Sequence, residues 1–258
     1  MRNLVFTSAG DNTTFYKLWT WPCNPRSEDA GPFGPSGPKT EAKQNFDIFA
    51  VYYGDSEENY EKYKGCVEHI EKRKGSKFQN FHWLWTQKPE LFDPYDRFFI
   101  LDDDILISCD DINKMFELSQ HFEICAPSFR KGSLISHKIT KQKKDCVFTY
   151  TNFVEVNTPL FSRKALDNLM NVYHPSLIGW GIDYLAIWAN GLEKDTSYGI
   201  IHSISCINPS KREKGGKREL LKIKNAKKRR ILWETYAAKL GCPKEFDKIV
   251  WSQLRTFS

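Results

Sequence analysis

Residues 97–105 have the sequence RFFILDDDI, in which a continuous apolar run ends in three consecutive aspartates. A short apolar run of this kind is typical of a strand buried on both faces of a parallel sheet. Carboxylates about 6 Å apart repel each other by roughly 3 kcal/mol per pair at an effective dielectric constant of about 20, and a divalent cation such as Mn²⁺ or Mg²⁺ would remove that cost. Asp102 and Asp104 leave an extended chain on the same side, so we predict that both are metal ligands. A solvated acidic turn that begins a helix is the alternative.

Strand patterns alternate with helix patterns along the chain, which predicts an α/β fold with a mainly parallel central sheet flanked by helices. We predict a core domain at residues 1–208, with a flexible Pro- and Gly-rich loop at 22–45, and a basic helical extension at 209–258 that packs on the core. Strands are expected at residues 3–8, 46–53, 79–86, 97–101, 122–127, 147–156 and 199–206, and helices at 57–74, 111–121, 162–172, 182–190 and 233–240.

The positive charge of the chain is concentrated near its C-terminus. The net charge is +6, from 38 Lys and Arg and 32 Asp and Glu residues. Residues 211–230 contain 11 basic and 2 acidic residues, so this segment contributes +9 and the rest of the chain −3. This distribution indicates a local feature, and we expect no nucleic-acid binding. The segment is either a solvated helix face or connector, or a peripheral contact with an anionic membrane surface.

The cysteines and the apolar segments indicate the cellular compartment in which we expect the protein. The seven cysteines form no CxxC pair and are odd in number, which favours reduced thiols in a cytosol-like compartment. No apolar run reaches the roughly 18 residues of a transmembrane helix, and the apolar part of the N-terminus is too short for a secretory signal. We therefore expect a cytoplasmic protein.

Three blocks of sequence resemble one family. YDRFFILDDDILIS at 95–108, FVEVNTPLFSRKAL at 153–166 and GWGIDYLAIW at 179–188 are similar, in order and spacing, to blocks of cytosolic metal-dependent glycosyltransferases with the GT-A fold. This group includes enzymes encoded by large algal viruses of the chlorovirus type, and the resemblance covers roughly residues 3–208. It implies a GT-A-like, Rossmann-related single domain, a UDP-sugar donor such as UDP-xylose or a UDP-hexose, a glycan acceptor that can be protein-linked, Mn²⁺ or Mg²⁺ dependence, inversion at the anomeric carbon, and action in a virus-infected host cell.

The resemblance also implies roles for individual residues. Asp183, which follows the Gly179-Trp180-Gly181 turn at a helix start, corresponds to the catalytic carboxylate that takes the proton of the acceptor hydroxyl. The first strand and its loop correspond to the nucleotide site, and small residues there let backbone groups approach the ribose and uracil. The nucleotide-sugar ligands are then Thr7, Ser8, Ala9, Gly10, Asp11, Asp102 and Asp103.

Acceptor residues and the third metal ligand are less sharply defined by the sequence. Glu155 is a charge inside an apolar strand pattern, which either binds a sugar hydroxyl or pairs with a Lys or Arg. Trp180 and Tyr184 either stack on a sugar face in the acceptor site or belong to the core. For the third metal ligand we predict His202, since imidazole suits Mn²⁺ better than an amide does, although the family pattern places this ligand at Asn208.

Two other classes of function are compatible with parts of the sequence. A metal-dependent phosphohydrolase would use the Asp102-x-Asp104 pair as nucleophile and acid/base, although Leu106 stands where such enzymes usually have Thr or Val. A non-enzymatic nucleic-acid binder would use residues 211–230, and its binding would be sensitive to salt. We prefer the glycosyltransferase.

Overall fold

A computed structural model describes residues 1–20, 43–209 and 219–255 of the chain. Most of the loop predicted at 22–45, and residues 210–218 of the basic segment, lie outside the described residues. The described strands form one sheet in the order β3-β2-β1-β4-β7-β5-β8-β6-β9. These strands are β1 (Asn3–Ala9), β2 (Phe46–Tyr52), β3 (His69–Lys72), β4 (Arg97–Asp102), β5 (Ile124–Phe129), β6 (Cys146–Thr151), β7 (Leu160–Ser162), β8 (Tyr198–Cys206) and β9 (Val250–Arg255).

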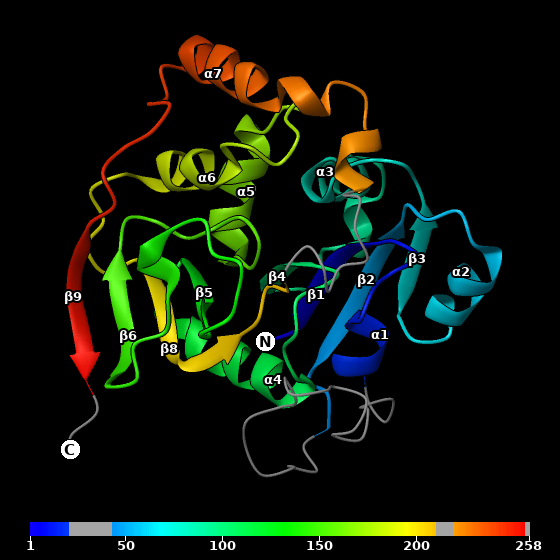
Figure 1. The fold of residues 1–258 in the computed structure, drawn as a ribbon, viewed down its shortest axis with the longest axis horizontal. Helices are drawn as coiled ribbons and strands as arrows, with labels where there is room; N and C mark the ends of the chain where they lie inside the picture. Colours follow the sequence, from blue (N-terminus) through cyan, green and yellow to red (C-terminus); the bar gives the residue numbers. More distant parts are fainter. Residues whose placement is uncertain (21–42, 210–218, 256–258) are drawn as a thin grey trace.

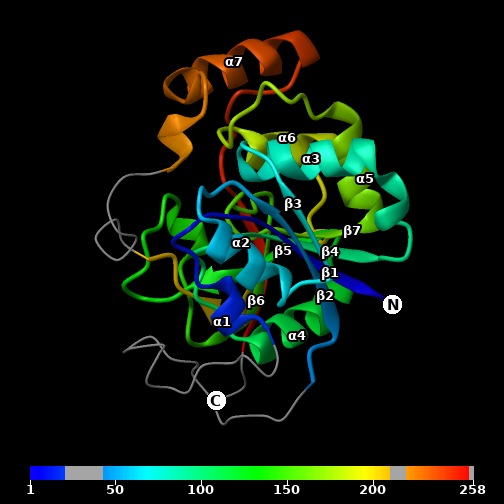
Figure 2. The same cartoon turned by 90° about the vertical axis from the view of Figure 1, so that its right-hand side faces the viewer.

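Helices cover both faces of this sheet (Figures 1 and 2). Residues of α3, α5, α6 and α7 join one core cluster with the inner side chains of the sheet, and residues of α1 and α4 join a second cluster on the other face. The helices are α1 (Phe15–Leu18), α2 (Glu57–Lys64), α3 (Lys77–Gln87), α4 (Cys109–Leu118), α5 (Arg163–Val172), α6 (Ile182–Asn190) and α7 (Arg229–Leu240). The predicted α/β class with helices flanking a central sheet is confirmed.

The sheet is parallel in one half and mixed in the other. Strands β3, β2, β1 and β4 pair in parallel. The inner strands β1, β2 and β4 are buried along nearly their whole length, as expected for strands of a parallel sheet. The short strand β7 then pairs antiparallel with both β4 and β5, and β6 pairs antiparallel with β8 and β9. The predicted strands near 3–8, 46–53 and 97–101 are confirmed, and their carboxyl ends lie at one edge of the sheet.

Several predicted elements were wrong. Residues 79–86, predicted as a strand, lie in helix α3, which starts with a capping box between Ser76 and Gln79. The helix predicted at 57–74 ends at Lys64 and is followed by strand β3, because the chain turns at Gly65. The strand predicted at 147–156 stops at Thr151, and the exposed edge strand β9 was not predicted at all.

The C-terminal part of the chain contacts the core through α7. Trp233 and Ala237 on this helix are fully buried and belong to the same apolar cluster as α5 and α6. The indole of Trp233 lies against Gly181, where a Cβ atom would approach it to 2.1 Å. Gly181 has φ of 81°, so both the backbone conformation and the close packing require glycine there. In the described part of the chain, no helix has the length and apolar character needed to cross a membrane.

Candidate active site

The three aspartates lie where the carboxyl ends of β1 and β4 meet. Asp102 is the last residue of β4 and is paired in register with Ser8 of β1. The following turn is fixed by the backbone pairing of Leu106 with Ile207, at 2.9 and 3.0 Å. Open α/β sheets bind ligands at this kind of edge. The predicted nucleotide loop and the predicted metal ligands are therefore neighbours.

Asp102 forms an ion pair with Lys77, a residue that the sequence analysis missed. Lys77 is the first residue of α3, and its Nζ lies 2.8 Å from Oδ1 of Asp102. The ammonium also donates to the carbonyl groups of Ile100, Val156 and Asn157 at 3.1, 2.8 and 3.0 Å. Burial lowers the pKa of Lys77, while the negative charge of Asp102 raises it in part. The capping box at Ser76 was the sequence signal that could have placed this lysine at a helix start.

Asp103 forms hydrogen bonds with residues 10–14, the loop between β1 and α1, which we call the β1 loop. Its Oδ2 accepts a hydrogen bond from the N–H of Gly10 at 2.8 Å, and the hydroxyl of Tyr53 lies 3.4 Å away. Its backbone carbonyl accepts from the hydroxyl of Thr13 at 2.6 Å and from the N–H of Thr14 at 3.2 Å. Asp103 is thus a support for the loop that follows β1.

The predicted nucleotide residues of β1 divide into core residues and loop residues. Thr7 is fully buried and donates to the carbonyl of Leu101 at 3.0 Å, and Ser8 accepts from the amide of Asn80 at 3.0 Å. Ala9 is also fully buried. Gly10 lies against the Tyr53 ring, where a Cβ atom would come within 2.6 Å of the hydroxyl. We call Asp102, Asp103 and Asp104 the acidic turn. Gly10 is the residue of the predicted nucleotide set whose backbone faces this turn.

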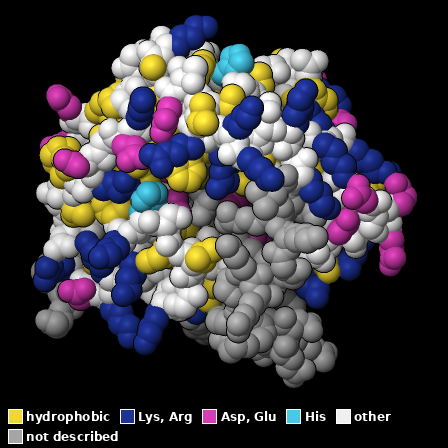
Figure 3. Space-filling view, turned by 45° about the horizontal axis from the view of Figure 1, so that its top comes forward, with side chains coloured by type: hydrophobic (Ala, Val, Ile, Leu, Met, Phe, Trp, Pro, Cys, Tyr) yellow, Lys and Arg dark blue, Asp and Glu magenta, His cyan; other side chains and the backbone are white. Residues whose placement is uncertain are grey.

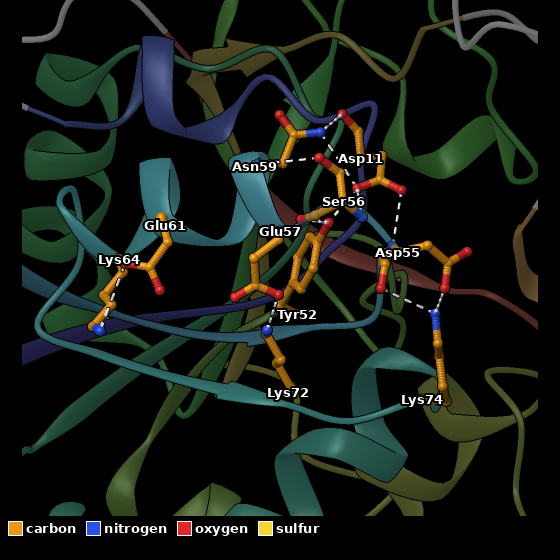
Figure 4. A network of polar contacts seen from close by, with 11 residues as sticks. Asp11, Tyr52, Asp55, Ser56, Glu57, Asn59, Glu61, Lys64, Lys72 and Lys74 are labelled. Atoms are coloured by element: carbon orange, nitrogen blue, oxygen red, sulfur yellow. Dashed lines mark hydrogen bonds and ion pairs between the residues drawn. The ribbon is translucent and has the colours of Figure 1, made fainter.

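Asp11 links the β1 loop to the loop after β2 (Figure 4). Its carboxylate accepts hydrogen bonds from the N–H groups of Asp55 and Ser56 at 2.9 and 3.2 Å, from Asn59 at 3.3 Å, and from the hydroxyl of Tyr52. Burial by itself would raise the pKa of Asp11, but these hydrogen bonds outweigh it and leave the pKa below its ordinary value. Both oxygens are thus engaged in holding two loops together.

Asp183 lies at the start of α6, in the position that the sequence predicted. Gly179 and Gly181 have φ of 72° and 81°, and the turn places Asp183 in the first helical turn, where it accepts from the N–H of Tyr184 at 3.1 Å. The side chain is buried and faces a small cavity with apolar walls that include Phe78 and Ile124. Burial raises the pKa of Asp183 to about 6, although the Tyr184 N–H opposes this shift.

Glu155 is influenced electrostatically by both Asp183 and Asp102. It is buried and accepts from the hydroxyl of Thr140 at 3.3 Å and from the amide of Asn157 at 3.1 Å. Burial raises its pKa to about 7, and the negative charges of Asp183 and Asp102 contribute. The backbone carbonyl of Asn157 accepts from both Lys77 and the N–H of Asp102, at 3.0 and 3.1 Å. Asn157 therefore connects Glu155 to the acidic turn.

The two candidates for a third metal ligand lie in different places. The N–H of Lys143 donates to Nδ1 of His202 at 3.3 Å, and Nε2 lies 3.2 Å from the hydroxyl of Thr149. Burial lowers the pKa of His202 to about 4, so this imidazole is neutral and both ring nitrogens are engaged. In this structure the ring takes part in the contact between β8 and β6, and its assignment as a metal ligand stays a prediction. Asn208 follows Ile207 directly and lies beside the acidic turn through the Leu106–Ile207 pairing.

Trp180 and Tyr184 contact residues from the C-terminal part of the chain. The guanidinium groups of Arg229 and Arg230 lie 5.4 and 6.0 Å from the centre of the Trp180 ring, which is 39% exposed. Tyr184 is buried, and its hydroxyl accepts from Nζ of Lys248 at 2.9 Å. Residues after 219 thus contact the loop and the helix that carry Asp183.

The described residues offer only a small number of side chains that could bind a metal ion at the acidic turn. Among residues 1–20, 43–209 and 219–255, no group of three or more His, Cys, Asp or Glu side chains is arranged to hold a metal ion. Mg²⁺ is usually bound by one or two carboxylates while substrate phosphates and water supply the other oxygens. Asp102 and Asp104, two carboxylates of one turn, are compatible with that smaller set, whereas the side-chain amide of Asn208 donates a hydrogen bond to the Leu134 carbonyl at 3.0 Å.

The comparisons with known proteins identify structures of the same fold. No protein-family model matches the chain, and no curated protein matches it in sequence. TarS 1–349 from S. aureus in complex with UDP-GlcNAc is similar with a TM-score of 0.58 and 13% identity over 93% of this chain and 66% of that chain. The same protein in complex with UDP gives 0.52 and 14%, over 93% of this chain and 72% of that chain.

This chain is shorter than the proteins that it resembles. It spans 62% of TarS 1–349 in a further structure, which has a TM-score of 0.54 and 12% identity over 83% of this chain. It spans 40% of the longer TarS chain, with a TM-score of 0.55 and 11% identity over 93% of this chain. At these identities the similarity concerns the fold. The expected GT-A-like α/β fold is thereby confirmed.

Proposed function

We propose that this chain is a glycosyltransferase that moves a sugar from a UDP-sugar to a hydroxyl group of a glycan, with inversion at the anomeric carbon. One observation carries the proposal: the β1 loop and the acidic turn meet at one sheet edge, and the buried carboxylate of Glu155 is influenced by the negative charges of both Asp102 at that edge and Asp183. The presence of UDP-GlcNAc and UDP in structures of similar fold supports a UDP-sugar as the donor.

Asp183 is the residue that we assign as general base. A buried carboxylate with a pKa near 6 is ionised at neutral pH and still binds a proton more strongly than an exposed aspartate does. It takes the proton of the acceptor hydroxyl while that oxygen forms a bond to the anomeric carbon. The bond from the anomeric carbon to the phosphate oxygen breaks, and UDP leaves with the electron pair. Glu155 holds a sugar hydroxyl beside this centre.

Asp102 and Asp104 are the residues that would hold Mn²⁺ or Mg²⁺. A bound divalent cation supplies neutralisation of the diphosphate. The ammonium of Lys77 balances part of the negative charge of Asp102 in the protein itself. Gly10, held by Asp103, presents its backbone on the nucleotide side of the acidic turn. The donor panel for a test is UDP-xylose, the UDP-hexoses and UDP-GlcNAc.

Thermal unfolding is the first test of this proposal. The midpoint is measured with UDP, with Mn²⁺ and with both, and a ligand at about 100 times its Kd adds roughly 2.7 kcal/mol of stability. We expect a large shift with UDP and Mn²⁺ together, followed by transfer from one donor of the panel that Asp183→Asn nearly abolishes. An Asp183→Asn protein with normal transfer would remove the base assignment.

Two outcomes would reject the proposal itself, one in the unfolding experiment and one in a hydrolysis assay. The absence of a shift with any combination of UDP and Mn²⁺ would remove the donor site. Hydrolysis of a simple phosphate ester that depends on Asp102 and Asp104, without transfer from any UDP-sugar, would favour the metal-dependent phosphohydrolase instead.

A further inference from the structure

A basic surface lies on the outer side of α7 and of the 3₁₀ turn Ala226–Lys228 that leads into it. The exposed side chains Lys224, Lys227, Lys228 and Ile231 form this surface, which we call the α7 face. Ile231 is 63% exposed, which is unusual for a large aliphatic side chain in this protein. Lys227 and Lys228 end the 3₁₀ turn directly before α7, and Ile231 lies in the first turn of that helix, so the three exposed side chains are neighbours along the chain.

The packing of α7 fixes the direction of this face. Ala226, Trp233 and Ala237 are buried against the core, so the opposite side of the helix points to solvent. Figure 3 tilts this end of the molecule toward the viewer, and Lys and Arg side chains are spread over the face that it shows. The α7 face therefore cannot turn inward unless Trp233 leaves the core.

The charge of the α7 face is not balanced by nearby carboxylates within the described residues. Of the ion pairs formed by residues 219–255, one joins Arg230 to Glu234 at 2.8 Å and another joins Arg255 to Asp145 at 3.8 Å. None of the ion pairs in the described part of the chain includes Lys224, Lys227 or Lys228. These three exposed lysines therefore attract an anionic partner to the α7 face.

We propose that the α7 face docks on an anionic lipid bilayer. Lysines with an exposed aliphatic side chain on one helix face are the combination that binds a membrane interface: the charges attract anionic headgroups and the apolar side chain enters the boundary with the acyl chains. A soluble polyanion would use the lysines but would gain nothing from Ile231. The exposed Ile231 is thus the observation that favours a bilayer.

Docking in this orientation places the candidate active site near the membrane. Trp233 packs on Gly181, and Arg229 and Arg230 contact Trp180, so α7 is joined directly to the loop that carries Asp183. A glycan acceptor attached to a lipid or to a membrane protein would then be presented on the Asp183 side. This last step rests on the proposed function, whereas the docking itself does not.

Vesicle sedimentation of the full chain tests the docking. We expect binding to vesicles of phosphatidylcholine mixed with phosphatidylserine, no binding to phosphatidylcholine alone, and weakening by added salt. Each lysine near an anionic surface contributes about fivefold in affinity, so Lys224→Glu/Lys227→Glu/Lys228→Glu should bind roughly a hundredfold more weakly. The matched control Lys131→Glu/Lys141→Glu/Lys144→Glu changes three exposed lysines of another loop and should bind nearly as well as the parent.

Ile231→Ser separates a bilayer from a soluble polyanion. It should weaken vesicle binding by about tenfold through the loss of apolar burial and leave binding to single-stranded RNA unchanged. Failure of the parent to bind anionic vesicles, or equal loss of binding in the control triple variant, would overturn the proposal. RNA binding tighter than vesicle binding, with no effect of Ile231→Ser on vesicles, would overturn it in favour of a nucleic acid.

The same variants separate this proposal from the proposed function. The α7 variants should keep the thermal shift with UDP and Mn²⁺, because none of the changed residues lies in the candidate active site. Vesicle binding without any UDP response would leave the docking in place and reject the glycosyltransferase. A UDP response without vesicle binding would do the reverse.

Discussion

The ammonium of Lys77 lies 2.8 Å from the Oδ1 atom of Asp102, and its three N–H groups are shared between this carboxylate and three backbone carbonyls. The lysine thereby joins the start of α3 to the end of β4 and to the segment that contains Asn157. Since Lys77 is nearly buried and Asp102 is 36% exposed, the pair is intermediate between a surface ion pair and a buried one. The pair fixes the end of β4, and with it the acidic turn, to the start of α3.

Lys77→Met should destabilise the protein by about 2 kcal/mol. Breaking a buried ion pair costs roughly 3–5 kcal/mol, and the partial exposure of Asp102 reduces that figure. Chemical denaturation at neutral pH measures the change. Lys74→Met is the matched control, because Lys74 pairs with Asp55 at an exposed site and should change stability by less than about 1 kcal/mol. Equal effects of the two variants would show that Lys77 is not a structural support.

Asp11→Asn should destabilise the protein by about 1–3 kcal/mol, because an amide has one acceptor oxygen where the carboxylate uses two. The folded state lowers the pKa of Asp11, so this contribution is present above the ordinary aspartate pKa and is lost as the pH falls through the lowered value. Denaturation at several pH values should therefore show the gap to the parent closing in acid. Asp55→Asn, whose carboxylate contacts Lys74 at an exposed site, serves as control and should change stability at neutral pH by less than about 1 kcal/mol.

Gly10→Ala should weaken UDP binding by about tenfold. The added Cβ would come within 2.6 Å of the Tyr53 hydroxyl, so the tyrosine ring must move or the loop must shift from Asp103. Calorimetric titration with UDP and Mn²⁺ measures the loss, and Tyr53→Ala in the same chain should restore part of the affinity. Gly65→Ala is a suitable control, since its Cβ would meet only the Lys62 carbonyl at 3.5 Å. UDP affinity in Gly10→Ala equal to that of the parent would exclude Gly10 from the nucleotide site.

Asp183→Asn should stabilise the protein above neutral pH while it removes transfer. Burial raises the pKa of Asp183 from 3.8 to about 6, so the folded state holds this proton more tightly than the unfolded state does. Stability therefore falls as the pH rises from about 4 to above 6, by about 3 kcal/mol. The asparagine variant avoids that cost and should be the more stable protein at pH 8 but not at pH 4. Parallel stability curves for the two proteins would contradict the raised pKa.

The rate of transfer should fall in acid with an apparent pKa near 6, because a protonated Asp183 cannot take the acceptor proton. The pKa of Glu155, about 7, depends in part on the charge of Asp183, so the two carboxylates titrate as a coupled pair. Glu155→Gln should therefore simplify the pH profile to one ionisation and keep measurable transfer. A profile that is flat between pH 5 and 8 would argue against a carboxylate base.

Lys248, from the C-terminal part of the chain, lies close enough to Asp183 to influence its pKa. Lys248 donates to the Tyr184 hydroxyl at 2.9 Å and lies 4.7 Å from the centre of the Phe153 ring. Its charge also lowers the pKa of Asp183. Lys248→Met should therefore move the acid limb of the pH profile to higher pH without loss of the UDP-dependent thermal shift. If the acid side of the pH profile did not move, Lys248 would contribute only packing and its hydrogen bond to Tyr184, and would have no effect on the pKa of Asp183.

The sequence by itself determined the fold class, the acidic turn at the end of β4 and the start of α6 at Asp183. These features are local: an apolar run followed by carboxylates, and glycines at positive φ before a helix, carry their signal within about ten residues. It missed α3, because the aromatic residues of 79–86 favour a strand while the capping box that starts the helix spans only four residues. It also missed β3, because Val67 and Ile70 continue the helical spacing of Tyr60 and Tyr63 past the end of α2 at Lys64.

Only the tertiary structure decided which polar side chains share one place. His202 and Asn208 lie six positions apart in the sequence, yet the bridge between Leu106 and Ile207 brings only Asn208 to the acidic turn, while His202 is engaged by Lys143 and Thr149. Lys77 reaches Asp102 across 25 positions, and Glu155 reaches both through Asn157. Such contacts depend on the order of strands in the sheet and on the burial that shifts each pKa, and neither property is encoded in a short stretch of sequence.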